Sequence, residues 1–227
     1  LPLENKLSLV KLLQRYYHLF AKDEYDLGIS TVVKHSIIVN HDTPIAQRPY
    51  RIPHALREEC GRQIKGMLDH GIIRQSASPW ASPIVMVKKK EGTLRFCVDY
   101  RKLNAMTRKD TYPLPRIDEM LDRLGHAQYF TILDLQSGFW QIEMEEVDKA
   151  KTAFTTGEGL YEFNVLPFGL TGSPPTFQRC MNFVLMDISH AMVYIDDIII
   201  FSKTFHEHLK DVESVFKRLI SGGLKVK

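Results

Sequence analysis

Two adjacent carboxylates interrupt an otherwise apolar and β-prone stretch in the last quarter of the chain, MVYIDDIIIF, where Asp196 and Asp197 separate two apolar runs. The runs predict a β-hairpin with the two acids at its turn. Such turns usually carry glycine, because they need a positive φ, and neighbouring carboxylates repel each other unless a cation relieves them. The pattern therefore indicates either a solvated turn or a cation site.

A third carboxylate, Asp134, lies near the end of another β-prone run, YFTILDL, at residues 129–135. Taken alone, Asp134 is as compatible with a plain structural role, as a strand-terminating residue or a helix N-cap, as with a metal ligand. If this strand neighbours the hairpin, the three carboxylates converge on one edge of a sheet. Hard oxygen ligands beside a polyphosphate suit Mg²⁺, and two such ions activate a hydroxyl and stabilise leaving pyrophosphate.

The composition describes an ordinary globular chain. Its 227 residues are 44% hydrophobic and 25% charged, which predicts one large domain or two small ones. Three widely spaced cysteines argue against a disulfide scaffold or a cysteine zinc site and favour a reducing compartment. No apolar run reaches the roughly 18 residues of a membrane span, and no signal peptide is recognisable at the start. The missing initiator Met indicates a piece of a longer protein.

Charge is unevenly distributed along the chain. The net charge is +3, yet residues 87–109 carry eight basic side chains against two acidic ones. A local basic cluster indicates a surface that faces a polyanion, with a solvated loop as the plain alternative.

Hairpins and helices alternate without the βαβ repeat, which predicts an α+β fold. Helical spacing opens the chain and returns at 54–70, 117–124, 173–186 and 205–220. Short β-type stretches are expected at 33–39 and 45–52. Hairpins are expected from strands 84–87 and 94–98, and from 152–155 and 161–165.

Four motifs occur in order along the chain: VKKKEG…R…VDYRKLN at 87–104, LDLQSGF at 133–139, LPFGLTGSP at 166–174 and YIDD at 194–197. Together with GIIRQSASPWASP at 71–83, they resemble the reverse transcriptases of gypsy-type LTR retrotransposons and, more distantly, the retroviral enzymes. The resemblance runs from about His35 to the end of the chain.

The resemblance implies a right-hand polymerase with fingers and palm, in which helices back an antiparallel palm sheet. Residues 1–34 would be a helical lead-in from an upstream polyprotein, 35–127 mostly fingers, and 128–227 mostly palm with a fingers hairpin at about 150–166. Thumb, connection and RNase H would be absent from this chain. The implied activity is RNA-directed DNA polymerisation within an LTR retrotransposon Pol polyprotein, through two Mg²⁺ ions for which Mn²⁺ can substitute.

The resemblance also implies roles for single residues. The catalytic metal ligands would be Asp134, Asp196, Asp197 and the carbonyl of Leu135. The dNTP would be bound by Lys89, Arg95, Phe139, Phe168 and Gly169. The template and primer would meet Tyr194, Ile195 and Gln178. Implied partners are a primed RNA or DNA template, dNTPs and the rest of the polyprotein, in a cytoplasmic particle and without a membrane.

Several alternatives stay open at this point. Phe139 is either an aromatic gate against the ribose 2′-OH or a core residue, and Gln178 lies either near the template or on a solvated surface. Lys88 or Lys90 could take the role given to Lys89. His206 and His208 form an HxH pair without further ligands, so solvent exposure is expected for both.

Two other functions compete with reverse transcription. One is a polymerase-shaped nucleic-acid-binding or scaffold module without turnover. The other is an RNA-dependent RNA polymerase, which an aromatic gate at Phe139 disfavours because such an enzyme must admit the 2′-OH.

Overall fold

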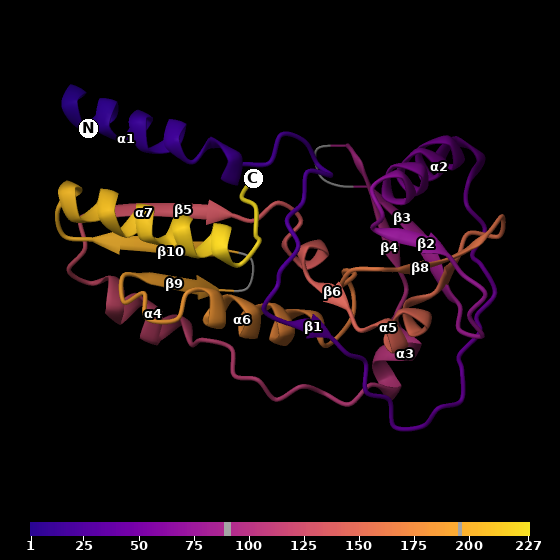
Figure 1. Ribbon diagram of the computed structural model, residues 1–227. Coiled ribbons are helices and arrows are strands. Elements are labelled where there is room, and N and C mark those ends of the chain that lie inside the picture. The colour runs from indigo at the N-terminus through magenta and orange to yellow at the C-terminus, as the bar shows by residue number, and fades with distance from the viewer. Residues whose placement is uncertain (89–91, 195–196) are drawn as a thin grey trace. The chain divides into compact units, whose positions relative to one another are not determined.

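The computed structural model describes residues 1–88, 92–194 and 197–227 of the chain. These residues form two compact units, each with its own sheet (Figure 1). The first unit comprises Leu1–Val33, Thr111–Gln141 and Pro174–Lys227, and the second comprises Lys34–Asp110 and Ile142–Ser173. Each unit is thus assembled from segments far apart in the sequence.

The sheet of the first unit has three antiparallel strands in the order β5-β10-β9. These are β5 (Tyr129–Asp134), β10 (Asp197–Ser202) and β9 (Ala191–Tyr194). The central strand β10 is rich in isoleucine, which favours the pleated conformation, and Ile198 and Ile200 are fully buried. The predicted hairpin and its neighbouring strand are therefore confirmed.

Helix α7 (Phe205–Ser221) packs on β10 and β5. Thr204 and Glu207 form a capping box that starts the helix, and its inward face buries Val212, Val215, Phe216 and Leu219. The other helices of this unit are α1 (Leu3–Arg15), η1 (Tyr17–Leu19), α4 (Ile117–Leu124), η2 (Gly138–Gln141) and α6 (Ser173–Val184), whose first residue falls in the second unit.

The sheet of the second unit has five strands in the order β2-β8-β7-β3-β4. They are β2 (Ile73–Gln75), β8 (Leu160–Phe163), β7 (Phe154–Thr155), β3 (Ser82–Lys88) and β4 (Leu94–Val98). The β3–β7 pair is parallel and the others are antiparallel. Tyr100 and Phe154 are buried in this unit, and the Tyr100 hydroxyl donates to Thr152 O at 2.8 Å.

The remaining elements of the second unit surround this sheet. They are β1 (Lys34–His35), α2 (His54–Asp69), α3 (Arg101–Met106), β6 (Glu143–Met144), α5 (Glu146–Lys149) and η3 (Ala150–Thr152). Strands β1 and β6 pair in parallel as a separate two-stranded sheet.

Both predicted hairpins of this unit are confirmed, as is the α+β fold. The strand predicted at 45–52 is wrong: that segment makes only one isolated bridge, from Ala46 to Ala81. Pro49 lacks the N–H that a paired strand requires. Pro53 restricts the backbone conformation of Ile52, the residue before it. The strand predicted at 33–39 shrinks to the two residues of β1.

Candidate active site

Two of the predicted catalytic carboxylates lie directly opposite each other at the end of the first unit's sheet. Asp134 is the last residue of β5, Asp197 is the first of β10, and the two are register partners. Paired residues on neighbouring antiparallel strands lie on one face, with Cα atoms about 4.5–5.5 Å apart. Asp197 also pairs with Tyr194, the last residue of β9. Asp134, Asp197 and Tyr194 therefore form a row across the sheet, here called the carboxylate row. Asp196 and Ile195 lie outside the described residues.

The C-terminal segment supports the Asp134 end of this row. Its Val226 bridges Leu135 on one side and Phe20 on the other, and the Lys227 N–H donates to Asp134 O at 2.9 Å. The Lys227 ammonium lies 3.5 Å from the Asp134 carboxylate, and both side chains are more than half exposed. A pair so exposed contributes little stability, but it shows that Asp134 accepts a cationic neighbour.

The carboxylate row suits a divalent cation. Like charges directly opposite each other on a sheet are destabilising, and a bound cation removes that repulsion. Two carboxylates with open solvent beside them are the oxygen ligands that Mg²⁺ uses together with substrate phosphates. Among the residues the structure describes, no cluster of three His, Cys, Asp or Glu side chains is assembled. The described part of the predicted metal site is therefore a pair of carboxylates and the carbonyl of Leu135, whose residue is 3% exposed.

The loop after β5 depends on one glycine. Ser137 has a positive φ of 46°, and a Cβ on Gly138 would meet the Phe177 ring at 2.9 Å. This close approach places Phe139 against Phe177, with ring centroids 5.4 Å apart at 67°. Phe139 is only 7% exposed. The structure thus shows that Phe139 packs in the core, one of the two alternatives that the sequence left open. Its role as a gate against the ribose 2′-OH stays a prediction.

In the second unit, Phe168 and Gly169 lie on an exposed loop, and the Phe168 ring is 47% exposed. Gly169 has a φ of +96°, which L side chains rarely adopt. The Asn104 side chain donates to Gly169 O at 2.8 Å and accepts from Thr171 N–H at 2.9 Å. Asn104 ends one of the quoted motifs, but its sequence context predicted no role for it.

The predicted basic hairpin is present as β3 and β4, with Arg95 exposed on β4 opposite Val87. Lys88 is exposed at the end of β3. Lys89 and Lys90 lie outside the described residues.

Arg101 donates to Asp99 through Nε at 2.8 Å and Nη2 at 2.7 Å. These two hydrogen bonds hold the pKa of Asp99 well below its usual range. Arg101 is therefore the structural partner of Asp99.

Gln178 is fully buried in the first unit. Its Nε2 donates to Val193 O at 3.2 Å and to Asn182 Oδ1 at 3.1 Å. The solvated alternative for Gln178 is wrong, because these backbone and side-chain partners take its amide into the core. A contact with template would require the amide to leave Val193, the neighbour of Tyr194.

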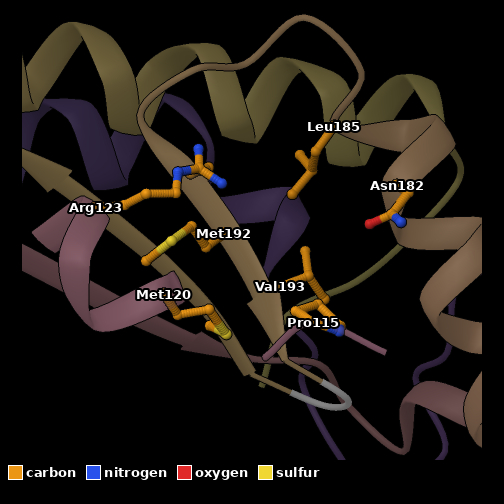
Figure 2. A pocket seen from close by; sticks show the side chains of 8 residues that line it. Pro115, Met120, Arg123, Asn182, Leu185, Met192 and Val193 are labelled. Carbon is orange, nitrogen blue, oxygen red and sulfur yellow. The ribbon is translucent and has the colours of Figure 1, made fainter. Parts of the chain in front are cut away.

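A cavity of about 170 Å³ lies beside β9 in the same unit (Figure 2). The residues that line it are mostly apolar: Pro115, Met120, Arg123, Asn182, Leu185, Ala191, Met192 and Val193. Arg123 donates to Ser189 O at 3.1 Å. The cavity is smaller than typical ligand pockets of about 300–1,000 Å³, and it contains none of the predicted site residues. It is therefore separate from the carboxylate row.

The expectation that His208 is solvated is wrong. His208 is 5% exposed and lies between Thr131 Oγ1, 2.8 Å from Nε2, and Ser202 Oγ, 3.0 Å from Nδ1. Ser202 donates its own proton to Asp211 at 2.6 Å. A neutral imidazole with its proton on Nδ1 therefore satisfies every partner. His206, two residues earlier, is exposed as expected.

Burial lowers the pKa of His208, although the charge of Asp211 opposes the shift. The unfolded chain therefore takes up this proton at a higher pH than the folded chain. The contribution of the neutral His208 to folding stability is complete above the pKa of about 6.5 in the unfolded chain. That contribution is lost as the pH falls through the lower pKa of the folded chain. We expect the urea midpoint of the wild type to fall more steeply between about pH 7 and 5 than that of His208→Gln. His206→Gln is the matched control and should follow the wild type; equal slopes for all three would contradict the prediction.

The fold and the facing carboxylates indicate one kind of chemistry. Carboxylates that face each other at the end of an antiparallel sheet can hold divalent cations for the transfer of phosphoryl or nucleotidyl groups. No helix in the described ranges is long and apolar enough to cross a bilayer.

Comparison with known proteins identifies the family. The family described as "Reverse transcriptase (RNA-dependent DNA polymerase)" matches residues 87–227. The retrovirus-related Pol polyprotein from transposon 297 of Drosophila melanogaster is 42% identical over 98% of this chain and 22% of its own length. That from transposon gypsy of the same organism is 38% identical over 91% of this chain and 21% of its own length.

A solved structure of the foamy viral protease-reverse transcriptase in complex with RNA/DNA hybrid superimposes with a TM-score of 0.93 and 30% identity, over all of this chain and 31% of that one. The chain belongs to the reverse transcriptase family, which confirms the predicted resemblance and fold. Enzymes of this family are RNA-directed DNA polymerases that normally use divalent metal ions. The chain spans about a fifth of the curated relatives it matches.

Proposed function

We propose that this chain is the fingers-and-palm part of an RNA-directed DNA polymerase that adds dNTPs to a primer 3′-hydroxyl, within an LTR retrotransposon Pol polyprotein. The observation that carries the proposal is the pairing of Asp134 with Asp197 at the open end of a sheet. Membership of the reverse transcriptase family supports it. The first unit would be mainly palm and the second mainly fingers.

The residues that would hold two Mg²⁺ ions are Asp134, Asp196, Asp197 and the carbonyl of Leu135. When bound, the ions lower the pKa of the primer hydroxyl and neutralise charge on the phosphates. The β5–β10 register would orient the carboxylates of Asp134 and Asp197, both of which are exposed. Mn²⁺ has the same preference for oxygen ligands, so it should substitute.

The substrate assignment follows the motifs. Arg95, with Lys89 from the same hairpin, would bind triphosphate oxygens, because guanidinium and ammonium groups donate charge-assisted hydrogen bonds. Phe168 and Gly169 would lie beside the incoming base, and Phe139 beside its sugar. Tyr194 and Ile195 would meet the primer terminus and Gln178 the template side. The foamy viral enzyme was solved with RNA/DNA hybrid, which supports a primed template as partner. We further propose dNTPs and the other Pol domains as partners, and a cytoplasmic particle as the location.

Single-turnover addition of one dNTP to a primed RNA template tests the proposal. We expect extension by one nucleotide with Mg²⁺ or Mn²⁺ and none after EDTA treatment. The control is a folded chimera in which the downstream part of the transposon 297 polyprotein follows Lys227. If both folded proteins bind the primed template but neither extends it, the polymerase proposal is wrong and the binding-module alternative replaces it.

A further inference from the structure

We propose that Asn104 is a positioning residue for the incoming nucleotide, acting through the loop of residues 167–173, the Gly169 loop. The inference rests on the proposed function, because the nucleotide-binding role of Phe168 and Gly169 does. It adds a residue that the sequence analysis left without a role.

Both the nitrogen and the oxygen of the Asn104 side-chain amide form hydrogen bonds with this loop. Nδ2 donates to Gly169 O at 2.8 Å, and Oδ1 accepts from Thr171 N–H at 2.9 Å. The two bonds span Leu170 and fix the orientation of the peptide groups on either side of it. A primary amide offers this donor and acceptor side by side in one plane.

The Gly169 loop is closed by short-range bonds within itself, such as Ser173 N–H to Leu170 O at 3.2 Å, and Asn104 connects it to α3. Phe168, Gly169 and Thr171 are exposed, and Leu170 is buried between them. The loop closes on itself where Ser173 Oγ donates to Pro167 O at 2.9 Å. Gly169 is held at a φ of +96°, where glycine samples alternative conformations at little cost. Asn104 therefore selects one loop conformation among several.

The element that carries Asn104 is firmly held. Helix α3 is short, but Leu103 and Met106 are buried in it, and Tyr100 just before it is 1% exposed. The Asn104 N–H also donates to Tyr100 O at 2.7 Å. A site whose supporting side chain lies on a packed element keeps its geometry better than one built on loop residues alone. The Gly169 loop thus takes its rigidity from α3, which lies 65 residues earlier.

Replacing Asn104 by Ala removes both bonds and leaves the backbone of α3 unchanged. We expect the dNTP dissociation constant in single-turnover addition to rise about tenfold, while affinity for the primed template changes less than twofold. Hydrogen exchange at Thr171 N–H should accelerate about tenfold or more. Asn104→Asp keeps the acceptor but places a carboxylate against Gly169 O, so it should raise the dNTP dissociation constant as well.

Asn164 supplies the matched control in the same unit. Its Nδ2 donates to Gly71 O at 2.8 Å in a partly exposed setting, so this bond, unlike those of Asn104, does not involve the Gly169 loop. Asn164→Ala should lower stability about as much as Asn104→Ala and leave the dNTP dissociation constant unchanged. This comparison separates a general loss of stability from a loss of nucleotide binding.

The outcomes are distinct. A selective rise in the dNTP dissociation constant for Asn104→Ala, or for Asn104→Asp if the Ala variant does not fold, supports the inference. Faster exchange at Thr171 with unchanged dNTP binding overturns it, as does an equal change in Asn164→Ala. In both cases the wild type still extends the primer. If neither the wild type nor the chimera with the downstream part of the transposon 297 polyprotein extends the bound primer, the proposed function is overturned, and the inference with it.

Discussion

Replacing Asp197 by Asn is expected to lower the single-turnover rate of nucleotide addition by about 10²–10³-fold or more while the protein stays folded. The amide has nearly the same shape as the carboxylate but lacks the charge that a divalent cation requires. The change also removes the repulsion between Asp197 and its cross-strand partner Asp134. The melting temperature should therefore stay the same or rise slightly. Asp134→Asn should behave in the same way.

Asp187 provides the control for this substitution. It is an exposed carboxylate of the same unit, its side chain is 79% exposed, and its nearest cation is Arg218 at 3.8 Å. Its φ is +69°, a conformation that asparagine adopts readily, so Asp187→Asn changes charge without strain. Its rate should equal that of the wild type. A wild-type rate for Asp197→Asn would place the metal site elsewhere in the chain.

The sequence predicted the elements around the carboxylates because their patterns are local. The isoleucines on either side of Asp197 and the run that ends at Asp134 specify strands by composition alone. The local sequence pattern does not show that these two strands are neighbours. Their pairing follows only from the family resemblance or from the structure. Where the local pattern conflicts with proline chemistry, as at residues 45–52, composition predicted a strand that does not form.

Buried polar residues were the main failures of the sequence analysis. Gln178 and His208 are polar, and nothing near them in sequence signals that they are buried. Their partners include Val193, 15 residues away, and Thr131, 77 residues away. A polar side chain enters a core only where such partners satisfy it, so its burial is a property of the tertiary fold. Asn104 was missed because its partners, Gly169 and Thr171, lie 65 and 67 residues away in the sequence.

Phe139→Ala is expected to lower the preference for dNTPs over ribonucleotides by about 10²-fold, if the ring blocks the space that a 2′-OH would occupy. The ring is also packed on Phe177 in the core, so the same change should lower the free energy of unfolding by roughly 3–5 kcal/mol. The measurement compares single-turnover addition of a dNTP and its ribonucleotide counterpart, together with urea unfolding.

Phe177→Ala separates the two roles of Phe139. Phe177 is the fully buried partner in the same aromatic pair, so its loss should destabilise the protein by a similar amount. If Phe139 is a gate, only Phe139→Ala changes sugar selection, since Phe177 contributes packing alone. Equal loss of selection in both variants would mean that packing of the loop, and not the Phe139 ring, excludes the 2′-OH. A wild type that prefers ribonucleotides would instead favour an RNA polymerase, because such an enzyme has to admit the 2′-OH.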